Sequence, residues 1–189
     1  MGENRLKLLI IERMDTHISK QYSGNYATHL GPLIACVNKT DGDILELGMG
    51  LFSTPYLHYA ATIAKRKLLS LENDPGWCRH FKGSNFMHFL YSNEYHQLEL
   101  VENYEESPLI DKEWDVVLVD QTPDLSRKET VKKLADKAKY IIIHDSNEQY
   151  EKVYHYSEIY PLFKYKRVWT LDDRHATVLS NFVDLEDLW

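Results

Sequence analysis

The sequence predicts an α/β fold, with a single doubly wound and mostly parallel sheet of seven strands. Short, nearly continuous apolar runs recur along the chain, as expected of strands that are buried on both faces of a parallel sheet. The segments between these runs carry helix start signals, and the first run is followed by a glycine turn. Strands that alternate with helices in this way are typical of parallel sheets covered by helices on both faces.

One domain is expected over residues 1–189, because the chain shows no internal repeat and no long linker. Residues 1–38 are predicted to form a helical N-terminal cap, since their apolar residues recur at helical spacing. Residues 43–189 are predicted to form the α/β core. Its parallel strands are expected at Ile44–Leu47, Leu68–Leu71, Phe86–Leu90, Val116–Val119 and Tyr140–Ile143. The tail, "FKYKRVWTL" followed by "HATVLSNFVDL", predicts an antiparallel hairpin that completes the sheet.

Three of the predicted helices have start signals in the sequence. Ser53 or Thr54 can cap the helix after the first strand, and Asp74 can cap the helix after the second; a proline follows each. Ser126 and Glu129 have the spacing of a capping box before a third helix.

Composition limits the classes of function. The formal net charge of −7 gives no general attraction to nucleic acid or to anionic membranes, so neither is expected as a partner. The two cysteines, Cys36 and Cys78, support no disulfide framework and suit a reducing compartment. The N-terminal apolar stretch is too short and too soon interrupted by charge to span a bilayer. A soluble, cytoplasmic protein is expected, and its aromatic C-terminal tail could pack against a second copy.

The ends of the first two predicted strands favour a nucleoside ligand. Gly48 and Gly50 in "ELGMG" allow a close approach that a side chain would prevent, and the next helix, from Ser53, offers free N–H groups to a polar ligand. Glu46 can meet a cation near this turn. Glu72 follows Gly48 by 24 positions, where a carboxylate can accept hydrogen bonds from ribose hydroxyls.

A dinucleotide fingerprint would have a third glycine at the position of Ser53. A ligand with an ammonium group, a sulfonium group and a ribose fits Glu46 and Glu72 better. The stretches "DILELGMGLFST" and "LLSLEND" resemble the first two motifs of the class I S-adenosylmethionine-dependent methyltransferases, which have a Rossmann-like fold. The similar layout extends from Gly42 to the C-terminus, although Phe52 replaces the usual third small residue of the loop.

The resemblance implies S-adenosylmethionine as the cofactor. Glu46, Gly48 and Gly50 would face its methionine portion, and Glu72 its ribose. The remaining candidate donor contacts are Ser53, Asn73, Ser92 and Asn93, the last two because they follow the predicted third strand, where this family contacts adenine. Trp77 is a further neighbour of the adenine, or a core residue. By analogy with family members whose N-terminal segment covers the site, Tyr22, Tyr26 or His29 would touch the donor or the substrate.

Polar residues also follow the fourth and fifth predicted strands. Asp120 ends "VVLVD", and His144 and Asp145 follow "YIII". Polar groups at that depth need partners, and the two strands can be neighbours, so Asp120 and Asp145 could share Mg²⁺ with Asn147. This arrangement resembles the magnesium-dependent catechol-type O-methyltransferases, although Ser146 stands where that family has asparagine. The alternative without a metal uses His144 as the base.

The function predicted is S-adenosylmethionine-dependent methylation, with transfer to an oxygen of a small hydroxylated metabolite. Asp120, His144 and Asp145 are the candidate catalytic residues. Two alternatives remain open at this stage. One is an NAD-type oxidoreductase that uses the same turn and Glu72, and the other is a non-catalytic module that binds S-adenosylmethionine or another nucleoside.

Overall fold

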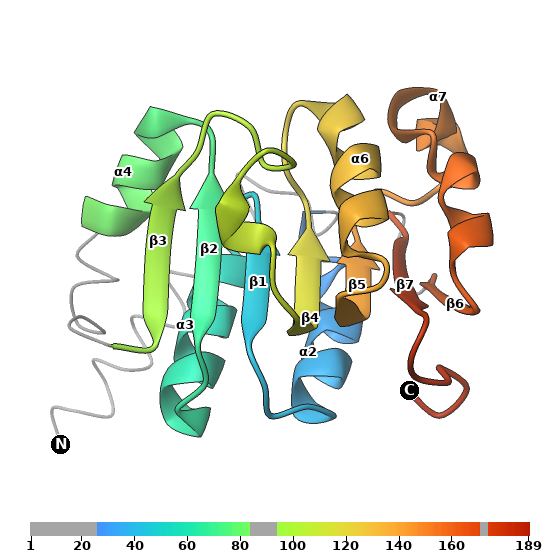
Figure 1. The fold of residues 1–189 in the computed structure, drawn as a ribbon, viewed down its shortest axis with the longest axis horizontal. Coiled ribbons are helices and arrows are strands. Elements are labelled where there is room, and N and C mark those ends of the chain that lie inside the picture. The colour runs from blue at the N-terminus through green and yellow to red at the C-terminus, as the bar shows by residue number, and fades with distance from the viewer. Residues whose placement is uncertain (1–25, 84–93, 171–173) are drawn as a thin grey trace, which may run out of the picture.

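The computed structural model describes residues 26–83, 94–170 and 174–189 (Figure 1). Its centre is a seven-stranded sheet with the order β3-β2-β1-β4-β5-β7-β6. The strands are β1 Ile44–Leu47, β2 Leu68–Glu72, β3 His96–Leu100, β4 Trp114–Val119, β5 Ala138–Ile143, β6 Tyr165–Trp169 and β7 Ala176–Ser180. Only β7 runs antiparallel to its neighbours, β5 and β6, while the other neighbouring pairs are parallel. The predicted fold class is confirmed.

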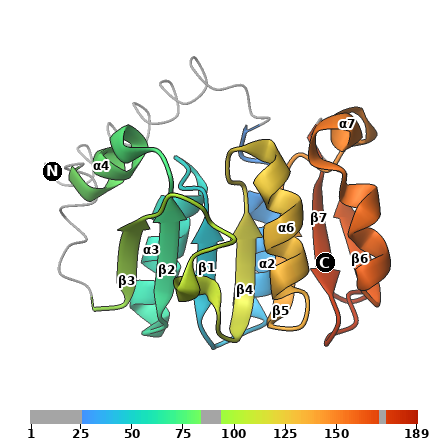
Figure 2. The ribbon, with the colours of Figure 1, turned by 45° about the horizontal axis from the view of Figure 1, so that its top comes forward.

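Helices cover both faces of the sheet (Figures 1 and 2). On one face lie α2 (Leu30–Asn38) and α3 (Ser53–Ala64). On the other lie α6 (Asp124–Leu134) and the segment that contains α7 (Glu151–Tyr154), while α4 (Pro75–Gly83) packs near β3. The short 3₁₀ helices are η2 Pro108–Ile110, η3 Glu148–Tyr150, η4 Tyr156–Glu158 and η5 Tyr160–Leu162. No helix in the described ranges has the length and apolar character needed to cross a membrane.

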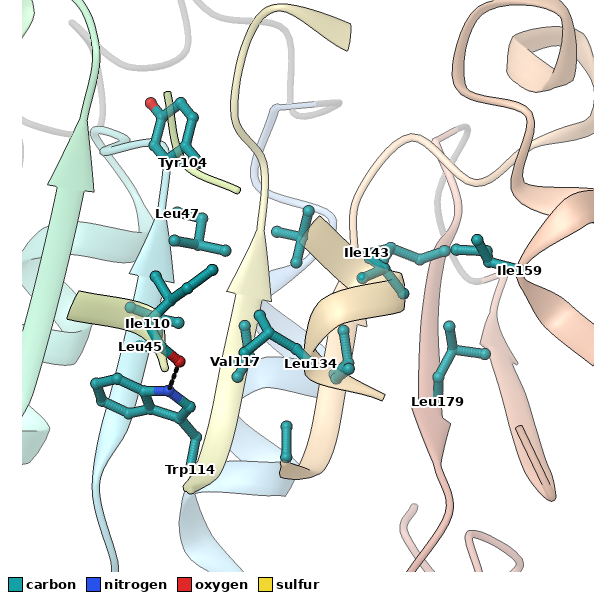
Figure 3. Packing of buried hydrophobic residues seen from close by; sticks show 14 of the residues in the cluster. Leu45, Leu47, Tyr104, Ile110, Trp114, Val117, Leu134, Ile143, Ile159 and Leu179 are labelled. Atoms are coloured by element: carbon teal, nitrogen blue, oxygen red, sulfur yellow. Dashed lines mark hydrogen bonds between the residues drawn. The ribbon is translucent and has the colours of Figure 1, made fainter. Parts of the chain in front are cut away.

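The apolar core has one layer on each side of the central strands. Figure 3 shows the α6 layer, where Leu134 packs over Val117 and Ile143. At the base of this layer the Trp114 indole donates a hydrogen bond to the Ile110 carbonyl at 3.0 Å, so its polar N–H is satisfied within the core. Every residue of β1, β2 and β4 is buried, which is why these strands read as continuous apolar runs.

The predicted third strand is misplaced. The sheet takes His96–Leu100 as β3, whereas the predicted Phe86–Leu90 lies outside the described residues. β3 is an edge strand, in which only Leu98 is buried. An edge strand needs no continuous apolar run, so its mixed sequence was a weaker signal than the apolar run before it.

The predicted helix starts are confirmed in part. Asp74 caps α4, since its carboxylate accepts a hydrogen bond from the Trp77 N–H at 2.6 Å. The α3 prediction is wrong, because α3 has no side-chain cap and the Thr54 hydroxyl is engaged elsewhere. The capping-box prediction for Ser126 is also wrong: α6 begins at Asp124, and the Ser126 hydroxyl donates to the Pro123 carbonyl.

A buried polar network lies beneath the turn that follows β1. The carboxylate of Glu46 is fully buried and accepts hydrogen bonds from Thr54 Oγ1 at 2.9 Å and from Ser70 Oγ at 2.5 Å. Thr54 Oγ1 in turn accepts the Gly50 N–H at 2.9 Å. Glu46 therefore connects β1, α3 and β2 and fixes the backbone of the glycine turn from below.

The same network extends toward the sheet edge through two histidines. His96 of β3 lies 2.9 Å from Ser70 Oγ, and its other ring nitrogen lies 2.8 Å from His58 of α3. Burial lowers the pKa of His96 to about 3, so the ring is neutral over the physiological range. A neutral imidazole can both donate and accept, which allows the chain of hydrogen bonds to continue from His58 to Glu46.

Glu46 makes stability depend on pH. Burial raises the pKa of its carboxyl to about 7 from 4.5. The folded state therefore holds a proton that the unfolded chain releases between those values, and the free energy of unfolding falls as pH rises through this window. Loss of that proton costs roughly 3 kcal/mol. Glu46→Gln should flatten this part of the pH profile, as measured by urea unfolding at pH 5, 6, 7 and 8.

Glu102→Gln changes an exposed acid and serves as the control. Its profile should run parallel to that of the wild type, whereas the gap between Glu46→Gln and the wild type should widen in favour of the variant toward pH 8. Equal pH profiles for Glu46→Gln and the wild type would contradict the raised pKa.

Candidate functional site

The ends of β1, β2 and β4 surround an open pocket of about 370 Å³. This is the edge where ligands bind in open α/β sheets, beyond the carboxyl ends of the strands. The residues that line the pocket are Gly48, Met49, Glu72, Asp74, Trp77, Asp120 and Thr122. Three of the predicted site residues, Gly48, Glu72 and Asp120, therefore face one cavity.

Gly48 is required by both conformation and space. Its φ is +86°, in the left-handed region that favours glycine. A Cβ atom at this position would lie 2.6 Å from the Asp120 carbonyl oxygen, so the turn after β1 packs directly on the end of β4. Gly48 N–H also donates to the Leu71 carbonyl at 3.0 Å. The turn is held against both neighbouring strands.

The carboxylate of Glu72 is buried and held by backbone amides. Oε2 accepts the Met49 N–H at 2.9 Å, and Oε1 accepts the N–H groups of Asn73 and Asp74, both at 2.9 Å. The Tyr104 hydroxyl lies 3.4 Å from Oε1. A carboxylate has about four acceptor positions, and Oε2 uses one of its two here. Glu72 is thus oriented toward the glycine turn and retains acceptor capacity beside the pocket.

Glu46 and Ser53 do not line the pocket. Both are buried under the turn, and Glu46 is bonded to Thr54 and Ser70. Their predicted contacts with the donor remain predictions. In the structure Glu46 acts on the pocket indirectly, by fixing the backbone of Gly50 through Thr54.

Asn73 and Trp77 lie at the β2 side of the pocket. The Asn73 amide donates to the Thr122 carbonyl at 2.8 Å, so a hydrogen bond joins the loops after β2 and β4, the two neighbours of β1. Trp77 lines the pocket, and its indole N–H donates to the Met49 carbonyl at 2.5 Å. Trp77 also packs against the small core cluster that contains Cys78. Both sequence-based interpretations of Trp77 are consistent with this position.

Ser92 and Asn93 lie outside the described residues. They were chosen because they follow the predicted third strand, and this reason no longer holds. β3 begins at His96, so both residues precede the strand. The chain at the carboxyl end of β3 continues with Val101, whose N–H donates to the Glu72 carbonyl at 2.9 Å.

A second group of polar side chains lies at the ends of β4 and β5, around Arg127 of α6. This buried guanidinium donates to Asp120 Oδ1 at 2.9 Å, to the Gln121 carbonyl at 2.7 Å and to the His144 carbonyl at 3.3 Å. Its face lies over the ring of Tyr154. Burial alone would lower the pKa of Arg127, but Asp120 together with Tyr156 and Tyr154 outweighs that effect and the pKa is raised.

Asp120 is the member of this group that faces the pocket, with 24% of its side chain exposed. Burial would raise the pKa of its carboxyl, yet the charges of His144 and Arg127 hold it well below its usual value. His144 Nδ1 lies 3.2 Å from Asp120 Oδ1, and His144 Nε2 lies 3.0 Å from the Thr28 hydroxyl. Asp120 and His144 are therefore in direct contact at the ends of β4 and β5, a pairing that the sequence analysis did not predict.

His29 packs edge-on against His144, with ring centroids 4.7 Å apart. Burial lowers the pKa of His29 to about 4, so its ring is neutral at neutral pH. The structure thus places His29 beside the candidate catalytic pair, at the end of β5. Analogy had placed one of three N-terminal residues near the site. Of the other two, Tyr22 lies outside the described residues, and the Tyr26 ring lies under Arg174.

The predicted magnesium site does not fit the structure. Asp145 is buried, has a φ of +54°, and accepts hydrogen bonds from Arg174 at 3.0 Å and from the Tyr154 hydroxyl at 3.3 Å. Asn147 Oδ1 accepts the His175 N–H at 2.6 Å. The arginine side chains already supply the positive charge that these carboxylates need. Asp145 and Asn147 therefore support the β5–β7 end of the sheet rather than a shared hard cation.

Sequence reasoning missed Arg127 and Arg174. Each is an arginine in a polar stretch, a pattern that normally indicates solvent exposure. The available signal was indirect. Carboxylates at the ends of buried strands, such as Asp120 and Asp145, need a compensating positive charge, which arginines can supply.

No protein-family model matches the sequence, and none of the curated proteins is similar to it. Solved structures are similar in fold. A human methyltransferase 10 domain-containing protein has a TM-score of 0.58 at 12% identity, over 82% of this chain and 83% of its own. An rRNA methylase from Streptococcus thermophilus has a TM-score of 0.61 at 12% identity, over 83% and 97%.

The spermidine synthase of Thermotoga maritima is also similar, with a TM-score of 0.64 at 13% identity, over 87% of this chain and 62% of its own. The fold of this chain is thus similar both to methyltransferases of different types and to a synthase. The chain has the Rossmann-like fold of the class I S-adenosylmethionine-dependent methyltransferases.

Proposed function

We propose that this protein is an S-adenosylmethionine-dependent methyltransferase that methylates an oxygen of a small hydroxylated metabolite. The observation that carries the proposal is the juxtaposition of two features in one pocket. A left-handed glycine turn lies beside the buried carboxylate of Glu72, and Asp120, in contact with His144, lines the same cavity. The fold it shares with known methyltransferases supports this choice.

The donor side of the pocket is built to bind a nucleoside. Glu72 is oriented by the amides of Met49, Asn73 and Asp74, so its remaining acceptor position is directed before any ligand arrives. Because Gly48 has no side chain, the turn packs directly on the end of β4, and this places Gly48 and Met49 in the lining of the same pocket as Glu72 and Asp120. When bound there, the donor supplies a methyl group that its sulfonium already activates. The protein then has to align the acceptor and remove one proton.

The acceptor side uses Asp120 and His144. Asp120 reaches the pocket, whereas His144 is buried behind it. The Asp120 carboxylate accepts a hydrogen bond from the acceptor hydroxyl and so sets its direction. Without a bound metal ion, the hydroxyl proton passes by way of the Asp120 carboxylate to the imidazole of His144, whose Nδ1 lies 3.2 Å from Asp120 Oδ1. Arg127 holds Asp120 in place throughout.

Charge and size support the proposed class of acceptor. A net charge of −7 opposes docking of nucleic acid, and the pocket of about 370 Å³ has the size of a small-molecule site. Among the three sequence-based hypotheses, the oxidoreductase loses support because Ser53 at the start of α3 is buried where a dinucleotide turn would need a glycine.

Replacement of Glu72 by alanine should weaken binding of S-adenosylmethionine about 10- to 100-fold, because hydrogen bonds to a charged group are lost. Titration calorimetry measures the dissociation constant. Glu99→Ala, on neighbouring β3, is the matched acid control and should leave it unchanged. An unaltered constant in Glu72→Ala would contradict the donor pose. A melting temperature raised by NAD and not by S-adenosylmethionine would favour the oxidoreductase instead.

Asp120→Asn and His144→Gln should each reduce turnover about 10²- to 10⁴-fold, the usual contribution of general acid–base catalysis. Donor affinity should stay within about threefold of the wild type, because neither residue lies on the nucleoside side. Release of S-adenosylhomocysteine is measured against a panel of hydroxylated metabolites. His155→Gln, an exposed histidine, is the control. If donor affinity falls as much as turnover, the assignment of Asp120 and His144 to the acceptor side is wrong. If the wild type binds the donor but methylates no acceptor of the panel, a non-catalytic module is favoured.

A further inference from the structure

His29 is a buried polar side chain that lacks its usual partners. Only 2% of the residue is exposed, and neither ring nitrogen has a hydrogen-bond partner among the described residues. Buried polar groups nearly always have a partner, because desolvation without one is costly. The ring packs edge-on against His144, with the two ring centroids 4.7 Å apart. Such a side chain is expected to bind a group that protein atoms alone do not provide.

The surroundings of His29 identify the chemistry of that group. Ring nitrogens of His29 and His144 and a carboxylate oxygen of Asp120 all lie within 4.8 Å of one another. Two imidazole side chains and one carboxylate are a common ligand set for divalent transition metals. The three side chains come from the segment before α2 and from the ends of β4 and β5, so the fold brings them together from separate parts of the sequence.

We propose that His29, Asp120 and His144 form a binding site for a divalent transition metal ion of the zinc, cobalt, nickel or ferrous iron class. This set differs from the magnesium set that the sequence suggested, since it shares only Asp120 with it. Imidazole ligands favour these softer ions, whereas Mg²⁺ prefers oxygen ligands. Because Asp120 lines the pocket, the fourth side of the site opens toward the acceptor.

The residues around the three ligands support this assignment. If the Thr28 hydroxyl accepts the Nε2–H of His144, the lone pair of His144 Nδ1 is directed at Asp120 Oδ1, 3.2 Å away. A cation bound to both atoms favours this tautomer, whereas without a cation the ring donates from Nδ1 to Asp120 and accepts the Thr28 hydroxyl at Nε2. Outer partners such as Thr28 and Arg127 are what orient the ligands of a metal site.

The opposing effect is the positive charge of Arg127, which already contacts Asp120. Asp145 offsets it, since its carboxylate lies 3.7 Å from His144 Nδ1 and 4.0 Å from Arg127. An acceptor bound as an oxyanion would add a further negative charge. The role of the ion as the group that acidifies and orients the acceptor hydroxyl rests on the proposed function. The existence of the site does not.

The test measures metal binding by the full-length chain without donor or acceptor. Protein freed of metal by dialysis against EDTA is titrated with CoCl₂, followed by its visible absorption, and with ZnCl₂ by calorimetry. The wild type is expected to bind one equivalent of either ion and to develop a cobalt absorption band. His29→Gln and His144→Gln should each weaken binding by at least about 100-fold, because even outer partners are typically worth 10–100-fold.

Two control variants separate this site from adventitious binding. His58→Gln changes a buried histidine that bonds His96, and His155→Gln changes an exposed one; both should bind cobalt as the wild type does. Circular dichroism and melting in EDTA establish that each variant is folded. Should a His29→Gln variant fail to fold, Asp120→Asn keeps the shape of the side chain and must show the same loss.

A wild type that binds neither ion more tightly than the His29→Gln/His144→Gln double variant overturns the proposal. In that case Asp120 and His144 remain the metal-free acid–base pair. If a protein that binds cobalt still transfers methyl groups after EDTA treatment, the metal has no role in catalysis, although the metal-binding site itself is confirmed. Metal binding by a chain that does not bind S-adenosylmethionine would refute the proposed function and not the site.

Discussion

The buried guanidinium of Arg127 is the interaction on which one half of the pocket depends. It bonds the carboxylate of Asp120 and the carbonyls of Gln121 and His144, and so joins the ends of β4 and β5 through α6. A buried charge of this kind is stable when it is paired with an opposite charge and hydrogen-bonded to further groups. Its pairing with Asp120 keeps that carboxylate ionised at the pocket wall, next to His144.

The other half of the pocket is held by a different device. Beneath the glycine turn, the described residues form a chain of hydrogen bonds from Gly50 through Thr54 to Glu46 and Ser70. The raised pKa of Glu46 shows that its charged form is disfavoured there. The nucleoside side is thus supported by a carboxyl that is easily protonated, and the acceptor side by one that is not. This difference follows from their neighbours, since His144 and Arg127 lie beside Asp120, whereas Glu46 is bonded to the hydroxyls of Thr54 and Ser70.

The proposed metal site and the failed magnesium site share Asp120 and differ in everything else. Asp145 is turned toward Arg174 by its left-handed backbone and by Tyr154, so it cannot act as the second oxygen ligand. His29, which lies just before α2, is instead the side chain close to both Asp120 and His144. A change from an oxygen ligand to an imidazole changes the class of ion, because ligand softness and not charge alone decides the preference.

The sequence by itself determined the fold class, the strands of the sheet centre, the glycine turn after the first strand and the placement of Glu72 near it. These features are local: buried parallel strands need continuous apolar runs, and a positive φ favours glycine. Only the tertiary structure decided that β3 is an edge strand with a mixed sequence, that arginines pair with Asp120 and Asp145, and that His29 lies on His144. The contact between Thr28 and His144 joins residues 116 positions apart. Such pairings depend on which chain segments share a buried space, and no periodicity along the sequence records that.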